Sequence, residues 1–259
     1  MTKEEIRRLA EALEAARRQR REIDRLTLAH PGMTLSEAYD IQGEGIALRA
    51  IVGDKPIGFK MGLTSQAKMK QMGVDSPICG VLTKSMGLPD GGIFPFKGSI
   101  HPRIEPEIAF IVGRDIKGRP GPEEAVKSCS GVCAAMEIID SRYRDFNFTL
   151  PDVIADNCSS CAFVPGPVIP NPSGVDVSRL KMTLEIDGKE VQTGSSEAIY
   201  GHPAQSLSAL CAMLEERGQY LKAGSIVLAG AATQAVALKP GSRVRAVVEG
   251  LGEVSVAIT

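Results

Sequence analysis

Apolar residues near the N-terminus recur at the spacing of a helix, with charged residues between them. This pattern predicts a helix over residues 3–26. A Pro-Gly break follows, and a second helix is expected over residues 34–51, with Glu37 completing a capping box at its start. We therefore expect residues 1–55 to form an N-terminal helical segment.

After this segment, short apolar runs alternate with glycine and proline, a pattern typical of strands joined by tight turns. Helices are expected among them over residues 65–72, 122–130 and 203–217, and a hairpin around Asp187-Gly188. The pattern indicates an α+β fold in which residues 56–259 form one β-rich domain with a closed or rolled mixed sheet.

The charge and composition exclude two classes of partner. The chain has 30 basic and 31 acidic side chains, a formal net charge of -1 and 4% aromatic residues. A nucleic-acid surface needs a basic face and stacking aromatics, so no nucleic-acid partner is expected. No apolar run approaches the roughly 20 residues that cross a bilayer, and no secretory signal is recognisable. We therefore expect no membrane association and a cytoplasmic location.

Six cysteines are present, and two of them, Cys158 and Cys161, form a CxxC pair in a Cys-Ser-Ser-Cys segment. A redox or zinc site of this kind needs a second CxxC or a nearby histidine pair, and the sequence has neither. Buried free thiols are therefore the favoured interpretation, as is usual in a reducing compartment.

Two acidic residues stand at the start of one apolar run, and a third lies inside another. Glu105 and Glu107 are two residues apart, so their side chains share a face if the segment is a strand, and Glu137 interrupts a second apolar stretch. Buried carboxylates need compensation, and three of them suit Mg²⁺ or Mn²⁺. In the alternative, Glu105 and Glu107 face solvent on an edge strand and Glu137 pairs with an arginine such as Arg142. The residues alone leave both open.

Polar residues beside the predicted strands supply further candidates, each with a structural alternative. Lys60 lies in an apolar run and precedes a glycine turn and a helix start at Thr64, where free N–H groups suit an anion. The alternative is a snorkelling lysine beside an ordinary helix cap. Asn157 and Ser159 either bind a ligand or shape a turn, and His202 is either a helix cap or a base.

Five blocks of sequence, in this order, resemble the hydratase/decarboxylase branch of the fumarylacetoacetate hydrolase superfamily. The blocks are Lys60–Ser65, Arg103–Phe110, Glu137–Tyr143, Val153–Ser160 and Gly201–Pro203. The resemblance extends over nearly the whole chain, including the N-terminal helices. It implies the β-rich mixed sheet roll of the family's C-terminal domain, with residues 56–259 as the catalytic domain. It also implies homo-oligomers and a Mg²⁺ or Mn²⁺ ion on Glu105, Glu107 and Glu137.

The resemblance further implies a lyase of the meta-cleavage pathway for aromatic compounds, acting on a small 2-oxo dicarboxylic acid. The expected reaction is metal-dependent decarboxylation of 2-oxo-3-hexenedioate (4-oxalocrotonate) to 2-hydroxypenta-2,4-dienoate. Residues 60–74 and 140–148 favour it over the alternative, hydration of 2-hydroxypenta-2,4-dienoate (2-keto-4-pentenoate). The branch also implies a complex with a homologous hydratase, and a non-catalytic partner subunit is a remote alternative. Cys158 and Cys161 depart from the residues usual in the branch.

By resemblance, the expected catalytic residues are Lys60, Glu105 and Glu107. Lys60 matches the lysine of the family's KxGLTS motif and is expected to orient an acidic end of the substrate or to transfer a proton. The expected substrate-binding residues are Leu63, Thr64, Ser65, Arg142, Asn157 and Ser160. The metal is expected to stabilise the charge that develops on the substrate as CO₂ leaves.

Overall fold

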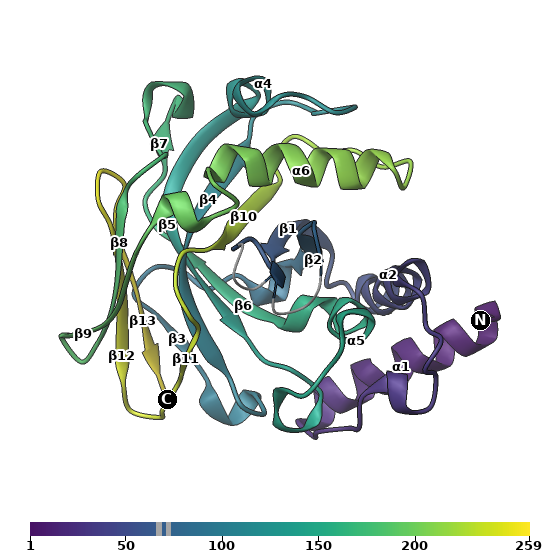
Figure 1. The fold of residues 1–259 in the computed structure, drawn as a ribbon. Coiled ribbons are helices and arrows are strands. Elements are labelled where there is room, and N and C mark those ends of the chain that lie inside the picture. Colours follow the sequence, from purple (N-terminus) through teal and green to yellow (C-terminus); the bar gives the residue numbers. More distant parts are fainter. Residues whose placement is uncertain (66–68, 71–73) are drawn as a thin grey trace.

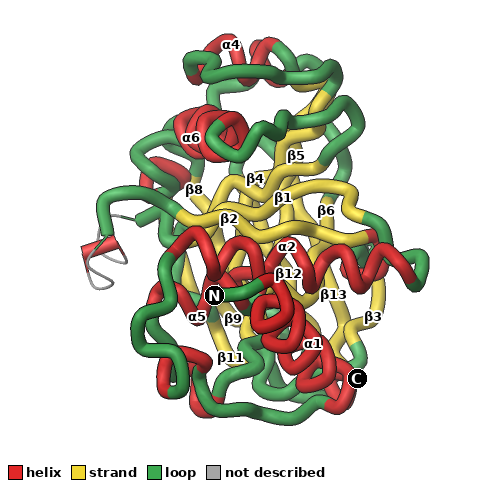
Figure 2. Tube along the Cα trace, turned by 90° about the vertical axis from the view of Figure 1, so that its right-hand side faces the viewer, coloured by secondary structure: helices red, strands yellow, loops and turns green. Residues whose placement is uncertain are grey.

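The computed structural model describes residues 1–65, 69–70 and 74–259. Two β-sheets form its centre, and the N-terminal helices lie on the side opposite the smaller sheet (Figure 1). In a view turned by 90°, these helices lie in front of the strands (Figure 2). Most of the helix predicted over residues 65–72 falls in the two gaps and so lies outside the described residues. Within the described ranges, no helix is long and apolar enough to cross a membrane.

Helix α1, Lys3–Gln19, begins after the N-cap residue Thr2. It is shorter than the predicted helix, which was expected to reach residue 26. Arg20 adopts a left-handed backbone conformation with φ 54°, and its N–H bonds to carbonyls of the last turn, which ends the helix. A short 3₁₀ turn, Leu26–Leu28, follows.

Helix α2, Leu35–Ile51, agrees with the prediction at both ends. Thr34 caps it, and the Glu37 side chain accepts a hydrogen bond from the Thr34 N–H at 2.9 Å, which completes the predicted capping box. Apolar side chains of α1 and α2 pack with those of α5, Leu150–Ala155, in one cluster. The division of the chain at residue 55 stays a prediction.

The larger sheet contains eight strands within the described residues, and six of them follow the order β2-β1-β10-β4-β5-β6. Strands β1 and β10 run parallel, whereas the other neighbours are antiparallel, so the sheet is mixed. The bounds are β1 Pro56–Gly62, β2 Ile78–Thr83, β4 Arg103–Val112, β5 Cys129–Ile139, β6 Ser160–Pro165, β7 Ile169–Pro170, β10 Ile226–Ala231 and β11 Val236–Ala237.

This sheet curls until its two edges meet. Gly87, shortly after β2, bridges to Phe163 on β6, and the Leu88 N–H donates to the Phe163 carbonyl at 2.9 Å. Asn157, which precedes β6, bonds to the backbone of Val81 on β2 through both ends of its side-chain amide, at 2.8 and 2.9 Å. The predicted mixed sheet roll is therefore confirmed.

The smaller sheet follows the order β3-β13-β12-β8-β9. Its bounds are β3 Gly92–Phe94, β8 Lys181–Ile186, β9 Lys189–Ser195, β12 Arg243–Val248 and β13 Gly252–Ile258. The predicted hairpin around Asp187-Gly188 joins β8 to β9. One face of β4 and β5 packs against this sheet in the main apolar core, which leaves their other face to line the interior of the roll.

Two further helices flank the sheets. Helix α4, Pro122–Lys127, is shorter than predicted because β5 begins at Cys129. Helix α6, Pro203–Glu215, begins where it was predicted to begin. Nδ1 of His202 accepts a hydrogen bond from the Ala204 N–H at 3.0 Å. Of the two roles considered for His202, the structure therefore shows that of a helix cap.

Candidate metal and substrate site

Three glutamates come together on two neighbouring strands of the roll. Glu105 on β4 faces Glu137 on β5 directly in the ladder, and Glu107 follows on the same face, opposite Ala135. One carboxylate oxygen from each glutamate lies within 4.8 Å of the others. All three are buried and β4 lies between β10 and β5, so the alternative of a solvent-facing edge strand is wrong.

Lys60 reaches this cluster from across the roll. It lies on β1, which β10 and β4 separate from β5, and three strand spacings amount to roughly 14 Å in a flat sheet. Yet the Lys60 Nζ lies 2.8 Å from Glu137 Oε2 and donates to the Cys158 carbonyl at 3.2 Å. The curl of the sheet therefore brings Lys60 onto the glutamates. Its side chain is only 4% exposed, so the snorkelling alternative is wrong.

The cluster holds more negative charge than the described residues neutralise. Burial raises the pKa of Glu107 well above its ordinary value, and Glu137 and Glu105 raise it further. Burial lowers the pKa of Lys60, but Glu137 and the other negative groups around it together outweigh burial and leave this pKa above its ordinary value. Glu107 Oε2 accepts from the Gly230 N–H at 2.7 Å, whereas its buried Oε1 has no hydrogen-bond partner in the described residues. Such an oxygen, among clustered carboxylates, fits a hard divalent cation.

Beyond Glu107, apolar side chains close the interior of the roll. Ala109 follows Glu107 on the same face and belongs to an apolar cluster that also contains Phe163. Exposure rises in the opposite direction along β4, from 0% at Glu107 to 6% at Glu105, and Arg103 is exposed. Along β4, the face that carries the glutamates therefore becomes exposed at Arg103.

Gly230 on β10 is a site residue that sequence reasoning missed. Its φ is 116°, and a Cβ atom there would stand 2.3 Å from Thr64 Oγ1. Glycine therefore lets the Thr64 side chain lie against the backbone that donates to Glu107. The available signal is a glycine inside an otherwise apolar run, which often marks a close approach of this kind.

Four predicted substrate-binding residues follow β1 or begin β6. Thr64 is buried and adjoins the glutamates through Gly230. Leu63 has a positive φ of 55°, which turns the chain sharply after β1, and Ser65 stands at the edge of the first gap in the described residues. Ser160, at the start of β6, is fully buried with its hydroxyl against a methionine sulfur.

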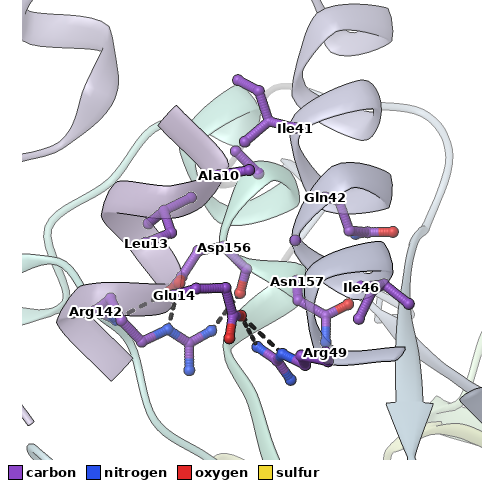
Figure 3. A pocket seen from close by; sticks show the side chains of 12 residues that line it. Ala10, Leu13, Glu14, Ile41, Gln42, Ile46, Arg49, Arg142, Asp156 and Asn157 are labelled. Carbon is purple, nitrogen blue, oxygen red and sulfur yellow. Dashed lines mark hydrogen bonds and ion pairs between the residues drawn. The ribbon is translucent and has the colours of Figure 1, made fainter. Parts of the chain in front are cut away.

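Arg142 and Asn157 use their polar groups within the chain. Arg142 pairs with Asp156 and donates to neighbouring backbone carbonyls, so the alternative pairing of Glu137 with Arg142 is wrong (Figure 3). Burial raises the pKa of Asp156 to about 6, although Arg142 opposes that rise. The side-chain amide of Asn157 is bonded at both ends to Val81.

The segment Asn157–Ser159 forms a left-handed turn. Its three residues have φ values of 50°, 53° and 57°, a region that costs energy for residues other than glycine. The turn aims the Cys158 carbonyl at Lys60, and the Asn157 amide and the Arg142–Asp156 pair support it on both sides. The sequence analysis gave a turn here as one alternative, but it did not indicate that the turn is left-handed.

The cysteine pair of the CxxC segment consists of free thiols, as do the other four cysteines. Burial raises the pKa of both Cys158 and Cys161 above the ordinary value for a thiol, which disfavours the reactive thiolate. The interpretation as free thiols is therefore confirmed.

A rolled mixed sheet that encloses clustered glutamates defines a class of protein as well as a site. The chain belongs to the fumarylacetoacetate (FAA) hydrolase C-terminal family, whose model matches residues 61–259. The family resemblance seen in the sequence is thereby confirmed.

Particular members of this family resemble the chain over nearly its full length. It is 45% identical, over 98% of both chains, to a 4-oxalocrotonate decarboxylase from a Pseudomonas species. It is 36% identical, over 97% of this chain and 95% of the relative, to a 2-hydroxyhexa-2,4-dienoate hydratase from Comamonas testosteroni. Among solved structures, a 4-oxalocrotonate decarboxylase from Pseudomonas putida G7 complexed with magnesium and adipate matches with a TM-score of 0.97 and 37% identity, covering 100% of this chain and 99% of the other.

Proposed function

We propose that this chain is a lyase that decarboxylates 4-oxalocrotonate (2-oxo-3-hexenedioate) to 2-hydroxypenta-2,4-dienoate in the meta-cleavage degradation of aromatic compounds. The observation that carries the proposal is the buried cluster of Glu105, Glu107 and Glu137 with Lys60 against it. The 45% identity to a 4-oxalocrotonate decarboxylase supports this reaction among those of the family.

Glu105, Glu107 and Glu137 hold a divalent cation, Mg²⁺ or Mn²⁺, in this proposal. Carboxylate oxygens are ligands that both ions prefer. The buried Glu107 Oε1, without a hydrogen-bond partner in the described residues, favours a bound ion, and the related Pseudomonas putida G7 enzyme is complexed with magnesium. When bound, such an ion supplies Lewis-acid stabilisation of the negative charge that develops on the substrate's C2 oxygen as CO₂ leaves.

Lys60 is the proposed orienting residue and proton donor. Its Nζ is fixed from two sides, by Glu137 at 2.8 Å and by the Cys158 carbonyl at 3.2 Å. An ammonium group has three donors, so one of them is left for a substrate oxygen. The buried surroundings strengthen that contact, and the apolar closure behind Glu107 excludes water from the inner end.

The remaining predicted site residues divide into two proposed roles. Leu63, Thr64, Ser65 and Ser160 are proposed to contact the substrate, because they lie where the chain leaves β1 or begins β6. Arg142 and Asn157 are proposed to act indirectly. Their bonds hold the left-handed turn that presents the Cys158 carbonyl to Lys60.

A second candidate function is hydration of 2-hydroxypenta-2,4-dienoate. The 36% identity to a hydratase favours it. Both reactions act on a 2-oxo acid or its enol, and both need negative charge to be stabilised near the metal ligands, so the glutamates serve either one. The substrates differ at the distal end, where the decarboxylase substrate carries a second carboxylate.

Two assays on one preparation separate the candidates. In the presence of Mg²⁺, the protein is given 2-oxo-3-hexenedioate and CO₂ release is measured. It is then given 2-hydroxypenta-2,4-dienoate, and the loss of its conjugated absorbance is followed. We expect CO₂ release in the first assay. Loss of absorbance in the second without CO₂ release in the first would reverse the ranking, and activity in neither assay would leave a non-catalytic partner subunit as the surviving alternative.

We also propose that the chain acts in the cytoplasm as a homo-oligomer, in a complex with a homologous hydratase. A cytoplasmic location is supported by the six free thiols. Self-association is supported by Ile51 and Val52, two adjacent apolar side chains that are each 79% exposed at the end of α2. Light scattering on the purified protein, with and without the hydratase, tests both contacts.

A further inference from the structure

Arg103 lies on the same face of β4 as the clustered glutamates. Strand β4 pairs with β5 residue by residue from Arg103 to Ile111, without a bulge, so Arg103, Glu105 and Glu107 point in the same direction. Consecutive residues on one face are roughly 6.6 Å apart along the strand. Arg103 is therefore the next side chain outward from Glu105, at the exposed end of this face.

An aromatic ring lies against the Arg103 guanidinium at this exposed end. Its central carbon lies 4.3 Å from the centre of the Phe146 ring, and the His101 ring contacts the same ring at 4.5 Å between centres, tilted by 38°. Phe146 is anchored in turn, because it contacts Phe148, and Phe148 contacts the fully buried Tyr143. The exposed end of the glutamate face thus carries a cationic side chain that packs on an aromatic ring.

Contact with an aromatic ring leaves the N–H donors of this guanidinium available. A guanidinium that stacks through its flat face keeps its N–H donors in the plane, where they match the two oxygens of a carboxylate. Among the described residues, no carboxylate forms an ion pair with Arg103. Arg142, by contrast, is fully buried and already paired with Asp156.

The charges of the proposed substrate also favour a cation at its outer end. The proposed substrate carries two carboxylates. One of them lies at the metal end, beside the 2-oxo group, and the other lies at the far end of a six-carbon chain. Arg103 stands at that outer end.

We infer that Arg103 binds the distal carboxylate of the substrate and so sets the preference of this site for a 2-oxo diacid over a 2-oxo monoacid. The inference rests on the proposed function, since it names the part of the site that recognises the second carboxylate. Arg103 is a specificity-determining residue in this reaction, and Phe146 positions it.

The exposed position of Arg103 suits a carboxylate that must leave as CO₂. A deeply buried ion pair would stabilise the ground state and raise the barrier to its departure. A guanidinium at the solvent-facing rim gives a weaker contact, because water screens it. It places the carboxylate without holding it strongly.

The test compares two ligands that differ only in the distal group, 2-oxohexanedioate and 2-oxohexanoate. Their dissociation constants are measured by calorimetry, in the presence of Mg²⁺, for the wild type, Arg103→Met and Arg103→Lys. Arg8→Met is the matched control, because Arg8 is an exposed arginine on α1 without an ion pair among the described residues. Thermal melting checks that each variant is folded.

We expect Arg103→Met to weaken binding of the diacid about tenfold, the equivalent of 1.4 kcal/mol, and to leave the monoacid unchanged. Arg103→Lys should keep part of the preference, and Arg8→Met all of it. In turnover, Arg103→Met should raise KM without lowering kcat. An Arg103→Met variant that keeps the full diacid preference, or that loses both ligands equally, overturns the inference. If the wild type prefers the diacid through Arg103 but releases no CO₂ from 2-oxo-3-hexenedioate, the proposed reaction fails while the carboxylate subsite stands.

Discussion

At the scale of single residues, Glu107 occupies the position in the site where a negative charge is most costly. It is fully buried, it lies beside two other carboxylates, and one of its oxygens has no hydrogen-bond partner in the described residues. A group in that state is costly unless a cation compensates it. Glu107 therefore offers the cleanest single-residue test of the metal centre.

We expect Glu107→Gln to lower the rate of decarboxylation by at least about 100-fold, because a change at a proposed metal ligand should cost more than changes at residues that only support a ligand. Mg²⁺ binding, followed by calorimetry, should weaken, while the circular dichroism spectrum stays that of the wild type. Glu190→Gln, at an exposed position on β9, serves as the control. Wild-type Mg²⁺ affinity in Glu107→Gln would remove Glu107 from the metal site.

Gly230 provides a second residue-level prediction. Alanine at this position would have to adopt a φ of 116° and would place its Cβ against Thr64 Oγ1, so the backbone that donates to Glu107 must shift. We expect Gly230→Ala to lower the free energy of unfolding by about 2 kcal/mol and to weaken Mg²⁺ binding. Denaturant titration and calorimetry measure the two effects.

The control for that substitution is Gly32→Ala, because a Cβ at Gly32 meets no atom within 4 Å. This variant should match the wild type in both measurements. If Gly230→Ala also matches the wild type, the close approach of Thr64 to the β10 backbone does not support the site.

At the scale of elements, a buried ion pair joins the two N-terminal helices. The Arg49 Nε on α2 donates to Glu14 on α1 at 2.7 Å, and both residues are buried (Figure 3). Burial raises the pKa of Glu14, but Arg49 and Arg17 outweigh burial, so the pKa in the folded protein is lower than the ordinary value of 4.5. Burial lowers the pKa of Arg49, yet an arginine stays charged.

A carboxylate with a lowered pKa in the folded state contributes stability above its unfolded pKa, and this contribution is lost as the pH falls through the lowered value. We therefore expect Glu14→Gln to cost about 3 kcal/mol of unfolding free energy at pH 7, because it leaves Arg49 buried without its partner. The cost should shrink as the pH falls below 4.5. Denaturant unfolding of both proteins at several pH values measures it.

Glu11→Gln is the matched control, since Glu11 pairs with Arg7 on the exposed face of the same helix and should contribute less than about 1 kcal/mol. If the difference between Glu14→Gln and the wild type is the same at pH 7 and at pH 4, the ion pair is not its cause.

The elements also show where local sequence signals suffice. The capping box of Thr34 and Glu37 marked the start of α2, and the Asp187-Gly188 pair marked a hairpin, because both signals act between residues close in the chain. The end of α1 depends on the left-handed conformation of Arg20, which no local pattern announced. Likewise, the supports of the 157–159 turn come from distant residues such as Val81.

At the scale of the whole molecule, the curl of the larger sheet assembles the candidate site. Alternation along a strand was enough to predict that Glu105 and Glu107 share a face, and the apolar run around Glu137 marked it as unusual. The contact between Lys60 and Glu137 depends on strand order, register and curvature, which alternation does not encode. The resemblance to a family supplied that link before the structure did. The role of Gly230 and the ion-pair partner of Arg142 could be identified only from the fold.

The most direct test of the proposed metal-dependent decarboxylase is the rate of CO₂ release from 2-oxo-3-hexenedioate by protein stripped of metal with EDTA, measured before and after Mg²⁺ is restored. If Glu105, Glu107 and Glu137 hold the ion that the reaction needs, the stripped protein should release no CO₂ above the uncatalysed background. Added Mg²⁺ should then restore the rate of the untreated protein. Full activity in the stripped protein would contradict the proposal.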